Sequence, residues 1–227
     1  MSKNRDIKVA LVGNPNTGKT SLFNQLTGLK QKVGNYPGIT VDKKIGTASL
    51  KGGLKAHIID LPGTYSINPT SIDENIVLNT LIDEGCEDYP DVIVVVADIE
   101  NLKRNLLPYS QIKDLQIPTV LAINMADQSE KKGIEIDVEG LKKELGGEVV
   151  LVSARHRRGI EELKAAIESY EELDTSVLAK ISHRIDKEYF DQLDKDFPRW
   201  DRYKTWLCLT QMLDISEMNE QEADLMR

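Results

Sequence analysis

The sequence predicts an α/β fold in which a mostly parallel, six-stranded sheet carries helices on both faces and is followed by a small helical domain. Short apolar runs alternate with helix-like segments up to about residue 172. A glycine-rich loop, residues 13–20, separates the first such strand from the first such helix. No strand-like run occurs after about residue 174. We therefore divide the chain into a sheet domain, residues 1–172, and a helical domain, residues 173–227.

The expected elements follow from hydrophobic spacing and from turn residues. Residues 7–12 form an apolar run typical of a buried parallel strand, and residues 18–27 have helical spacing. Residues 28–39 are rich in glycine, asparagine and proline, which predicts an irregular loop. Ser71 with Glu74 three residues later has the pattern of a helix-capping box. Further strands are expected at 42–50, 54–60, 91–97, 118–124 and 149–153, and further helices from Ser71 and at 102–115, 138–145 and 160–173.

The last part of the chain has a different character. Residues 171–227 hold 14 Asp and Glu against 8 Lys and Arg, together with both tryptophans. Trp200, Tyr203 and Leu207 recur at helical spacing, which predicts a helical unit packed on the sheet domain. Residues 220–227 are strong helix formers without a stop signal, so we expect the natural protein to continue.

Composition narrows the function classes. The chain has 227 residues, of which 40% are hydrophobic and 29% charged, as in globular proteins. A net charge of −8 argues against a nucleic-acid-binding protein, which normally carries a basic face. The two cysteines, Cys86 and Cys208, lack metal-site spacing and are expected to be reduced, as in the cytosol. No apolar run approaches the length of a membrane span.

The glycine-rich loop has the spacing G-x-x-x-x-G-K-[ST], between a strand and a helix. This context predicts a P-loop, whose backbone N–H groups surround phosphate oxygens at a helix N-terminus. Lys19 can reach the β- and γ-phosphates, and the Thr20 hydroxyl can ligate Mg²⁺. The expected phosphate-binding residues are Gly13, Asn14, Pro15, Asn16, Thr17, Gly18, Lys19, Thr20 and Ser21.

Two downstream loops can complete the phosphate side of this site. Thr40 ends the first loop, where its hydroxyl can complete the Mg²⁺ coordination shell when a γ-phosphate is present. Loss of that phosphate would then free the loop. Asp60 follows a strand and is expected to hold Mg²⁺, through water. The Gly63 N–H is expected to meet the γ-phosphate. The residues expected to act in catalysis are Lys19, Asn16, Thr40 and Gly63.

Two further motifs predict recognition of guanine. The Asn124-Met125-Ala126-Asp127 run follows a buried strand, and its amide and carboxylate match the O6 edge and the N1–H and amine of guanine. Adenine would leave the carboxylate unpaired. Ser153-Ala154-Arg155 follows the last strand, where the Ala154 N–H can donate to O6. Five motifs in this order, each at the carboxyl end of a strand, predict a GTPase with the Ras-like G-domain form of the P-loop NTPase fold.

Catalysis is expected to be slow. Thr64 follows Gly63, where Ras-like enzymes have the glutamine that orients the attacking water. Neither loop contains an arginine that could act as a finger in cis, since Arg104 lies beyond a further strand. Backbone groups or a partner would have to position the water.

Three alternatives stay open on the residues alone. A ribosome-assembly or tRNA-modification GTPase can share these motifs, although such proteins usually carry a basic RNA-binding domain. A nucleotide switch, in which GTP binding orders residues 28–41 and hydrolysis only resets them, is a binding module rather than an enzyme. An iron-sensing patch could be formed by the acidic residues Asp73, Glu74, Asp83, Glu84, Glu87 and Asp88, although solvated helix faces carry such charges routinely.

The chain closely resembles the cytosolic N-terminal GTPase region of the FeoB family of bacterial ferrous-iron transport proteins. The stretches that carry this resemblance are 13–24, 33–41, 60–66, 98–106 and 124–127. The likeness is dense from residue 7 to about 170 and covers the rest only in layout. Ile99-Glu100 departs from it, where a small pair is expected, and the 153–158 loop is more basic than expected, which would alter nucleotide release.

The resemblance implies properties that the residues alone do not. It implies that a membrane domain that carries iron(II) follows residue 227. It also implies that the part described by this sequence lies on the cytoplasmic face of the bacterial inner membrane. It implies that the helical domain steadies GDP and relays the nucleotide state. It implies K⁺ as an activating ion held by Asn16, with backbone carbonyls near Gly34 and Asn35. Small cytosolic Feo accessory proteins and a second copy of the chain are further candidate partners, and the sequence does not give the oligomeric state.

Overall fold

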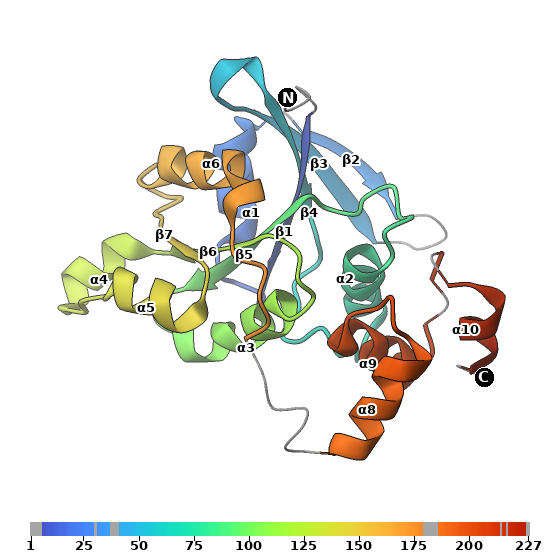
Figure 1. Cartoon of the computed structure of the whole chain (residues 1–227). Helices are drawn as coiled ribbons and strands as arrows, with labels where there is room; N and C mark the ends of the chain where they lie inside the picture. The colour runs from blue at the N-terminus through green and yellow to red at the C-terminus, as the bar shows by residue number, and fades with distance from the viewer. Residues whose placement is uncertain are drawn as a thin grey trace.

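A seven-stranded sheet forms the centre of the computed structural model (Figure 1). The structure describes residues 6–29, 31–36, 41–178, 186–213, 215–216 and 218–225. The strand order is β2-β3-β4-β1-β5-β6-β7. The strands are β1 (Ile7–Gly13), β2 (Gln31–Asn35), β3 (Asp42–Ser49), β4 (Lys55–Asp60), β5 (Val92–Asp98), β6 (Thr119–Asn124) and β7 (Glu148–Leu151). Strand β3 pairs antiparallel with β2 and β4, and the other pairs are parallel, which confirms the predicted fold class.

The sheet has one strand more than the six expected. Residues 31–35, inside the segment predicted to be an irregular loop, form the edge strand β2 and pair with residues 42–46 of β3. Residues 32–35 are exposed, so no buried face leaves an alternating pattern in the sequence. Backbone hydrogen bonds to β3, rather than side-chain burial, define this strand.

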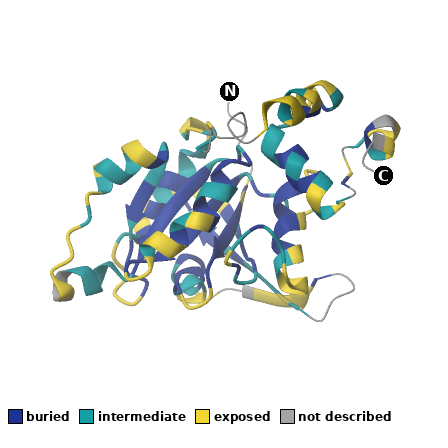
Figure 2. Ribbon diagram, turned by 90° about the horizontal axis from the view of Figure 1, so that it is seen from below, coloured by how far each residue is buried: buried dark blue, intermediate teal, exposed yellow. Residues whose placement is uncertain are grey.

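Different helices cover the two faces of the sheet. The helices are α1 (Lys19–Thr27), α2 (Ile72–Ile82), α3 (Leu102–Lys113), α4 (Ala126–Lys132), α5 (Val138–Leu145), α6 (Ile160–Glu168), α8 (Lys187–Asp196), α9 (Arg202–Gln211) and α10 (Glu220–Leu225), with short 3₁₀ turns at Lys51–Gly53 and Tyr170–Glu172. Leu11 of β1 packs in one apolar cluster with residues of α1 and α6. Its neighbour Val12 belongs to the opposite cluster, which contains residues of α2, α3 and α5. Figure 2 shows the buried residues gathered in the strands and on the helix faces turned toward them.

The helices after residue 173 pack on the α2–α3 side of the sheet (Figure 1). Leu207 and Cys208 of α9 are buried in the same cluster as Ile76 of α2 and Ile112 of α3. The described residues after 173 contain helices and no strand, as the sequence predicts. Among the described helices, none has both the length and the apolar character that crossing a bilayer requires.

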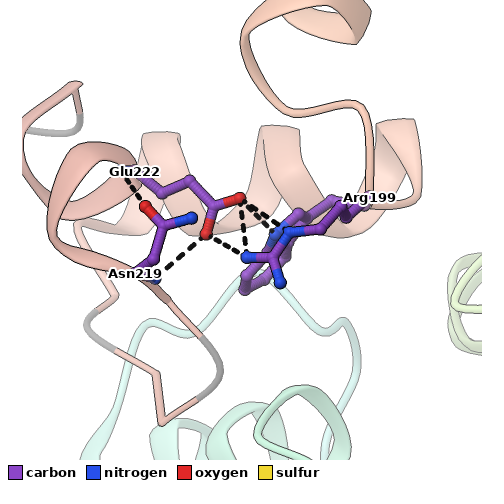
Figure 3. A network of polar contacts seen from close by, with 4 residues as sticks. Arg199, Asn219 and Glu222 are labelled. Carbon is purple, nitrogen blue, oxygen red and sulfur yellow. Dashed lines mark hydrogen bonds and ion pairs between the residues drawn. The ribbon is translucent and has the colours of Figure 1, made fainter.

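The last described helix is held by a polar network around Glu222 (Figure 3). Glu222 accepts hydrogen bonds from the Arg199 guanidinium at 2.7 and 2.9 Å and from the Trp200 ring N–H at 3.2 Å. The Asn219 N–H donates to the same carboxylate at 3.0 Å, and the Asn219 side chain accepts from the Glu222 N–H at 2.9 Å. This reciprocal pair is a capping box at the start of α10.

The network favours the ionised form of Glu222. Burial alone would raise its pKa, but the hydrogen bonds from Arg199, Asn219 and Trp200 outweigh burial and lower the pKa below the usual value. The stabilisation is therefore present above the pKa of an unfolded glutamate and is lost as the pH falls through the lower folded value.

We expect Glu222→Gln to lower the free energy of unfolding at pH 7 by about 1–3 kcal/mol, because charged acceptor bonds are lost from a buried site. The difference from the wild type should begin to shrink as the pH falls below about 4, where the unfolded chain takes up the proton, and should be lost below the lowered pKa of the folded carboxylate. Urea unfolding followed by tryptophan fluorescence measures both effects. Glu220→Gln, at an exposed position of the same helix, is the control. A pH-independent difference would contradict the assigned role of the charge.

Candidate functional site

The glycine-rich loop joins β1 to α1 at the carboxyl edge of the sheet. Gly18 is the N-cap of α1 with a φ of 83°, and Asn16 also has a positive φ, of 69°. The buried Thr17 closes the loop, since its hydroxyl donates to the Asn14 carbonyl oxygen at 2.9 Å. The N–H groups of the first helical turn have no carbonyl partner within the helix, which makes this end of α1 a site for an anion.

Two glycines of this loop permit close backbone approaches. A Cβ atom at Gly13 would lie 2.4 Å from the carbonyl oxygen of Val96 on β5. A Cβ atom at Gly18 would lie 2.3 Å from Nδ2 of Asn124 at the end of β6. The loop therefore reaches its position only because both residues lack a side chain.

The residues expected to bind phosphate and Mg²⁺ meet at the ends of β1 and β4. The Lys19 ammonium group donates to the buried Asp60 carboxylate and to the Leu61 carbonyl oxygen. The Thr20 hydroxyl lies 3.4 Å from the second carboxylate oxygen of Asp60. A hydroxyl and a carboxylate are oxygen ligands of the kind that a small, hard divalent cation such as Mg²⁺ takes. Thr40, the third expected ligand, lies outside the described residues.

Residues 61–71 form a loop that lies against the glycine-rich loop. The Thr64 N–H donates to the Gly13 carbonyl oxygen at 3.1 Å, and a Cβ atom at Gly63 would lie 3.1 Å from the Pro15 ring. The Thr64 side chain is fully buried and bonds to the Ser66 carbonyl oxygen and to Glu74. It therefore points into the loop rather than toward the phosphate side.

Glu74 holds the start of α2 and the end of this loop. The Ser71 hydroxyl accepts from the Glu74 N–H at 3.3 Å, which confirms the helix start, but the Glu74 carboxylate accepts from the Thr70 N–H at 2.8 Å instead of from Ser71. Burial would raise the Glu74 pKa, but hydrogen bonds from Thr70, Tyr65 and Thr64 lower it. The ionised carboxylate thus accepts hydrogen bonds from several residues of the loop and holds them together.

The residues expected to recognise guanine converge from three segments. Asn124 donates from Nδ2 to the Thr17 carbonyl oxygen at 2.9 Å, and its Oδ1 accepts from the Ala154 N–H at 3.1 Å. Asp127 accepts from the Ser153 hydroxyl at 2.6 Å, and the exposed His156 ring lies 3.5 Å from its other oxygen. A carboxylate, an amide and a backbone N–H therefore lie together at one edge of the sheet. These are the types of donor and acceptor with which the Watson–Crick and O6 edge of guanine can pair.

A polar cavity of about 370 Å³ lies between the glycine-rich loop and α3. Asn16 lines it, as do Tyr65 from the 61–71 loop and Arg104 from α3. Asn14 also lines it and is buried, and neither of its amide atoms has a hydrogen-bond partner among the described residues. The cavity is therefore rich in amide groups that can ligate or hydrogen-bond.

Most of the other residues predicted to bind the nucleotide or a metal ion lie at exposed positions or in contacts away from the glycine-rich loop. Gly34 and Asn35 lie on the exposed edge strand β2, opposite Lys43 and Asp42 of β3. Ser21 and Arg155 are exposed, and Met125 has a positive φ at the start of α4. In the suggested iron-sensing patch, Asp83 bonds to Ser216, Glu84 to Lys204 and Asp88 to Lys43. Among the described residues, no His, Cys, Asp or Glu cluster has the arrangement of a metal site.

Two side chains of α3, Arg104 and Gln111, lie beside the site although no motif predicted them there. The Arg104 guanidinium lies 4.3 Å from the centre of the Tyr65 ring, although a strand separates them in sequence. Gln111, two turns further along α3, accepts from the Ser66 hydroxyl at 3.0 Å and from the Ile67 N–H at 3.2 Å. Only the packing of α3 beside the 61–71 loop brings them there. Helical spacing of Arg104 and Gln111 is a signal that could have placed them on one face.

Comparison with known proteins identifies relatives of this chain. Residues 7–167 match the family described as "Ferrous iron transport protein B". The chain is 38% identical over 217 residues to the Fe(2+) transporter FeoB of Salmonella typhimurium, covering 92% of this chain and 27% of that protein. It is 41% identical over 170 residues to the Escherichia coli K12 transporter, covering 73% and 21%. The chain thus spans about a quarter of the length of these relatives.

Solved structures are similar over the whole chain. The cytosolic domain of the T. maritima FeoB iron transporter in a GDP form is 34% identical with a TM-score of 0.81, covering all of this chain and 92% of that one. An S. thermophilus NFeoB mutant bound to GDP is 32% identical with a TM-score of 0.75, covering 96% and 87%. On the match over residues 7–167 and these identities, the chain belongs to the FeoB family of ferrous iron transport proteins.

Proposed function

We propose that this chain is the GTP-binding part of a ferrous iron transporter. In this proposal it binds GTP and GDP with Mg²⁺, hydrolyses GTP slowly, and couples the nucleotide state to iron(II) passage through a membrane portion of the protein. The observation that carries the proposal is the convergence of Asn124, Asp127 and the Ala154 N–H beside the glycine-rich loop. Relatives named Fe(2+) transporters and similar structures bound to GDP support it.

Guanine selectivity follows from the donors and acceptors at this edge. The Asp127 carboxylate would accept from guanine N1–H and the exocyclic amine. The Ala154 N–H, which donates to Asn124 Oδ1 at 3.1 Å in this structure, would leave that contact to donate to O6. Adenine presents an acceptor at N1 and an amine at the O6 position, so it would leave both groups unpaired. Ser153 keeps the carboxylate oriented, since its hydroxyl bonds to Asp127 at 2.6 Å.

Slow hydrolysis follows from the loop after Asp60. Lys19 leaves its contact with Asp60 to bind the β- and γ-phosphates, and the Gly63 N–H meets the γ-phosphate. Thr20, Thr40 and Asp60 would hold Mg²⁺, which would supply positive charge beside these oxygens when bound. The Thr64 side chain is buried and engaged with Ser66 and Glu74, so it does not replace the absent glutamine. Backbone groups or a partner would position the water, and the rate stays low.

Potassium is the proposed activating ion. Asn16 is exposed at the rim of the amide-rich cavity. Its backbone is in the left-handed region, with a φ of 69°. An amide oxygen is a suitable ligand for a large monovalent cation, and backbone carbonyls of Gly34 and Asn35 complete the proposed shell. The bound cation would supply positive charge where no arginine finger is available.

The rest of the proposal concerns the whole protein. This part lies on the cytoplasmic face of the bacterial inner membrane, with residues 1–172 as the GTP-binding domain and residues 173–227 as a helical domain that steadies GDP. The membrane portion is its main partner, and Feo accessory proteins or a second copy of the chain are further candidates. The chain covers only 27% of the length of the Salmonella typhimurium transporter, which supports the proposal that the whole protein has a further, membrane portion. Nucleic acid is not a proposed partner, since the net charge is −8.

We expect Asp127→Asn to weaken GDP binding by about 10²- to 10⁴-fold, because two hydrogen bonds to a charged acceptor are lost. Calorimetry with GDP and ADP in the presence of Mg²⁺ measures this loss and the guanine preference. Asp73→Asn, at an exposed position in the first turn of α2, removes the same charge away from the base and should leave both unchanged. If the wild type holds ADP as tightly as GDP, or Asp127→Asn keeps its preference, the base pocket is wrongly assigned.

We expect GTP hydrolysis to be faster in KCl than in NaCl at equal ionic strength, on the order of 10-fold or more, as for other groups that stabilise transition-state charge. Asn16→Asp should alter this potassium dependence, measured as phosphate release. Gln128→Glu adds the same charge to the rim of the cavity without changing the loop, so it should retain the dependence. Equal rates in both salts, with Asn16→Asp also unchanged, would remove potassium from the proposal.

A further inference from the structure

Arg104, near the start of α3, stacks on the ring of Tyr65 in the 61–71 loop. Its Cζ atom lies 4.3 Å from the centre of that ring. Among the residues that the structure describes, the ring is the partner found for this guanidinium, and no carboxylate pairs with it. A guanidinium over an aromatic face is a cation–π contact, to which the planar arginine group is better suited than the lysine ammonium group.

The start of α3 is a firm support for this contact. Asn105 and Asp98 are both buried, and the Asn105 Oδ1 accepts from the Asp98 N–H at 2.7 Å. The Asp98 carboxylate in turn accepts from the Asn101 N–H at 2.8 Å and from the Asn101 side chain at 2.9 Å. Asp98 is the last residue of β5, which lies next to β1 in the sheet. The first turn of α3, which carries Arg104, is therefore fixed to the strands that position the glycine-rich loop.

Tyr65 lies two residues after Gly63, whose N–H is expected to meet the γ-phosphate. Thr64, between them, is held on the sheet side, since its N–H donates to the Gly13 carbonyl oxygen at 3.1 Å. Tyr65 itself is 43% exposed, so the apolar core fixes its ring only in part. The contact with Arg104 is thus a second point at which this short segment is held.

The stacked pair also lines the cavity beside the glycine-rich loop. Tyr65 and Arg104 line it together with Pro15 and Asn16. A Cβ atom at Gly63 would lie 3.1 Å from the same Pro15 ring. The pair therefore lies close to the backbone group that the proposed hydrolysis requires.

We propose that Arg104 is a positioning residue for GTP hydrolysis, which holds residues 63–65 through the Tyr65 ring so that the Gly63 N–H is aligned with the γ-phosphate. The proposal rests on the function proposed above. The Thr64 side chain is buried in the loop and does not replace the absent glutamine, so the chemical step depends on backbone alignment. The expected effect therefore falls on the rate of that step rather than on nucleotide affinity.

A direct role of the guanidinium is the alternative. An arginine beside the phosphates can stabilise transition-state charge itself, as an arginine finger does. The contact with Tyr65 favours the indirect role, because the guanidinium already occupies the face of the ring. Substitution of the ring separates the two roles, since an indirect role is lost with the ring and a direct role is not.

The test measures the chemical step by single-turnover hydrolysis of GTP, with the full chain in excess and with Mg²⁺ and KCl present. Calorimetry gives the affinities for GDP and for a non-hydrolysable GTP analogue. Arg104→Met removes the charge and the planar group, and Tyr65→Leu removes the ring. Arg104→Lys and Tyr65→Phe are the conservative variants. Lys103→Met, which removes an exposed charge from the same turn of α3, is the matched control.

We expect Arg104→Met and Tyr65→Leu each to slow single-turnover hydrolysis by about 2- to 5-fold, on the scale of one exposed cation–π contact, with both affinities unchanged. The double variant should be no slower than either single variant, because both remove the same contact. Arg104→Lys should lose part of the rate, and Tyr65→Phe should restore most of what Tyr65→Leu loses. Lys103→Met should hydrolyse GTP as the wild type does.

A wild-type rate in Arg104→Met, or losses that multiply in the double variant, would refute the role through Tyr65. A loss of about 10³-fold or more in Arg104→Met with Tyr65→Leu unchanged would assign the guanidinium a direct role at the phosphates and overturn the proposal. Lower affinity or stability at an unchanged rate would reduce the pair to a structural contact. Absence of GTP binding by the wild type would refute the proposed function itself, whereas binding and hydrolysis with unaffected variants would refute only this inference.

Discussion

The candidate site depends on one side-chain amide, that of Asn124. Its NH₂ group bonds to the Thr17 carbonyl oxygen and its oxygen to the Ala154 N–H, so it joins the glycine-rich loop to the loop after β7. Asn124 is buried, and so is Thr17, which makes these bonds costly to break. Gly18 must lack a side chain for the amide to fit. The phosphate side and the base side of the site are thereby fixed relative to one another.

The sheet makes this arrangement possible. Strands β1, β4, β5 and β6 run parallel, so their carboxyl ends meet at one edge, where a ligand of an open α/β sheet binds. Three of these strands deliver different chemical groups: backbone donors after β1, a carboxylate at the end of β4, and an amide at the end of β6. The buried, apolar strands hold these groups, while the loops that carry them remain at the surface.

Elements away from this edge connect it to the rest of the chain. Glu74 accepts a hydrogen bond from the Thr70 N–H of the 61–71 loop, and the Thr64 N–H of the same loop donates to the Gly13 carbonyl oxygen at the end of β1. Helix α3 lies between that loop and α9, whose apolar residues share the cluster on this face of the sheet. The helical domain is thus built onto the same core that positions the site, rather than connected only by a linker. Such packing gives a change at the site a physical path to residues after 173.

The sequence by itself determined the fold class, the glycine-rich loop and the order of the recognition residues, because these depend on local spacing: apolar runs, a G-x-x-x-x-G-K-T string and short motifs after strands. It did not reveal β2, whose exposed residues carry no hydrophobic pattern and whose pairing depends on β3. It also set Arg104 aside and passed over Gln111, since a strand or more separates each from its partner in the 61–71 loop. Contacts of that kind arise only when distant segments pack together, so the tertiary structure alone decided which side chains surround the predicted site.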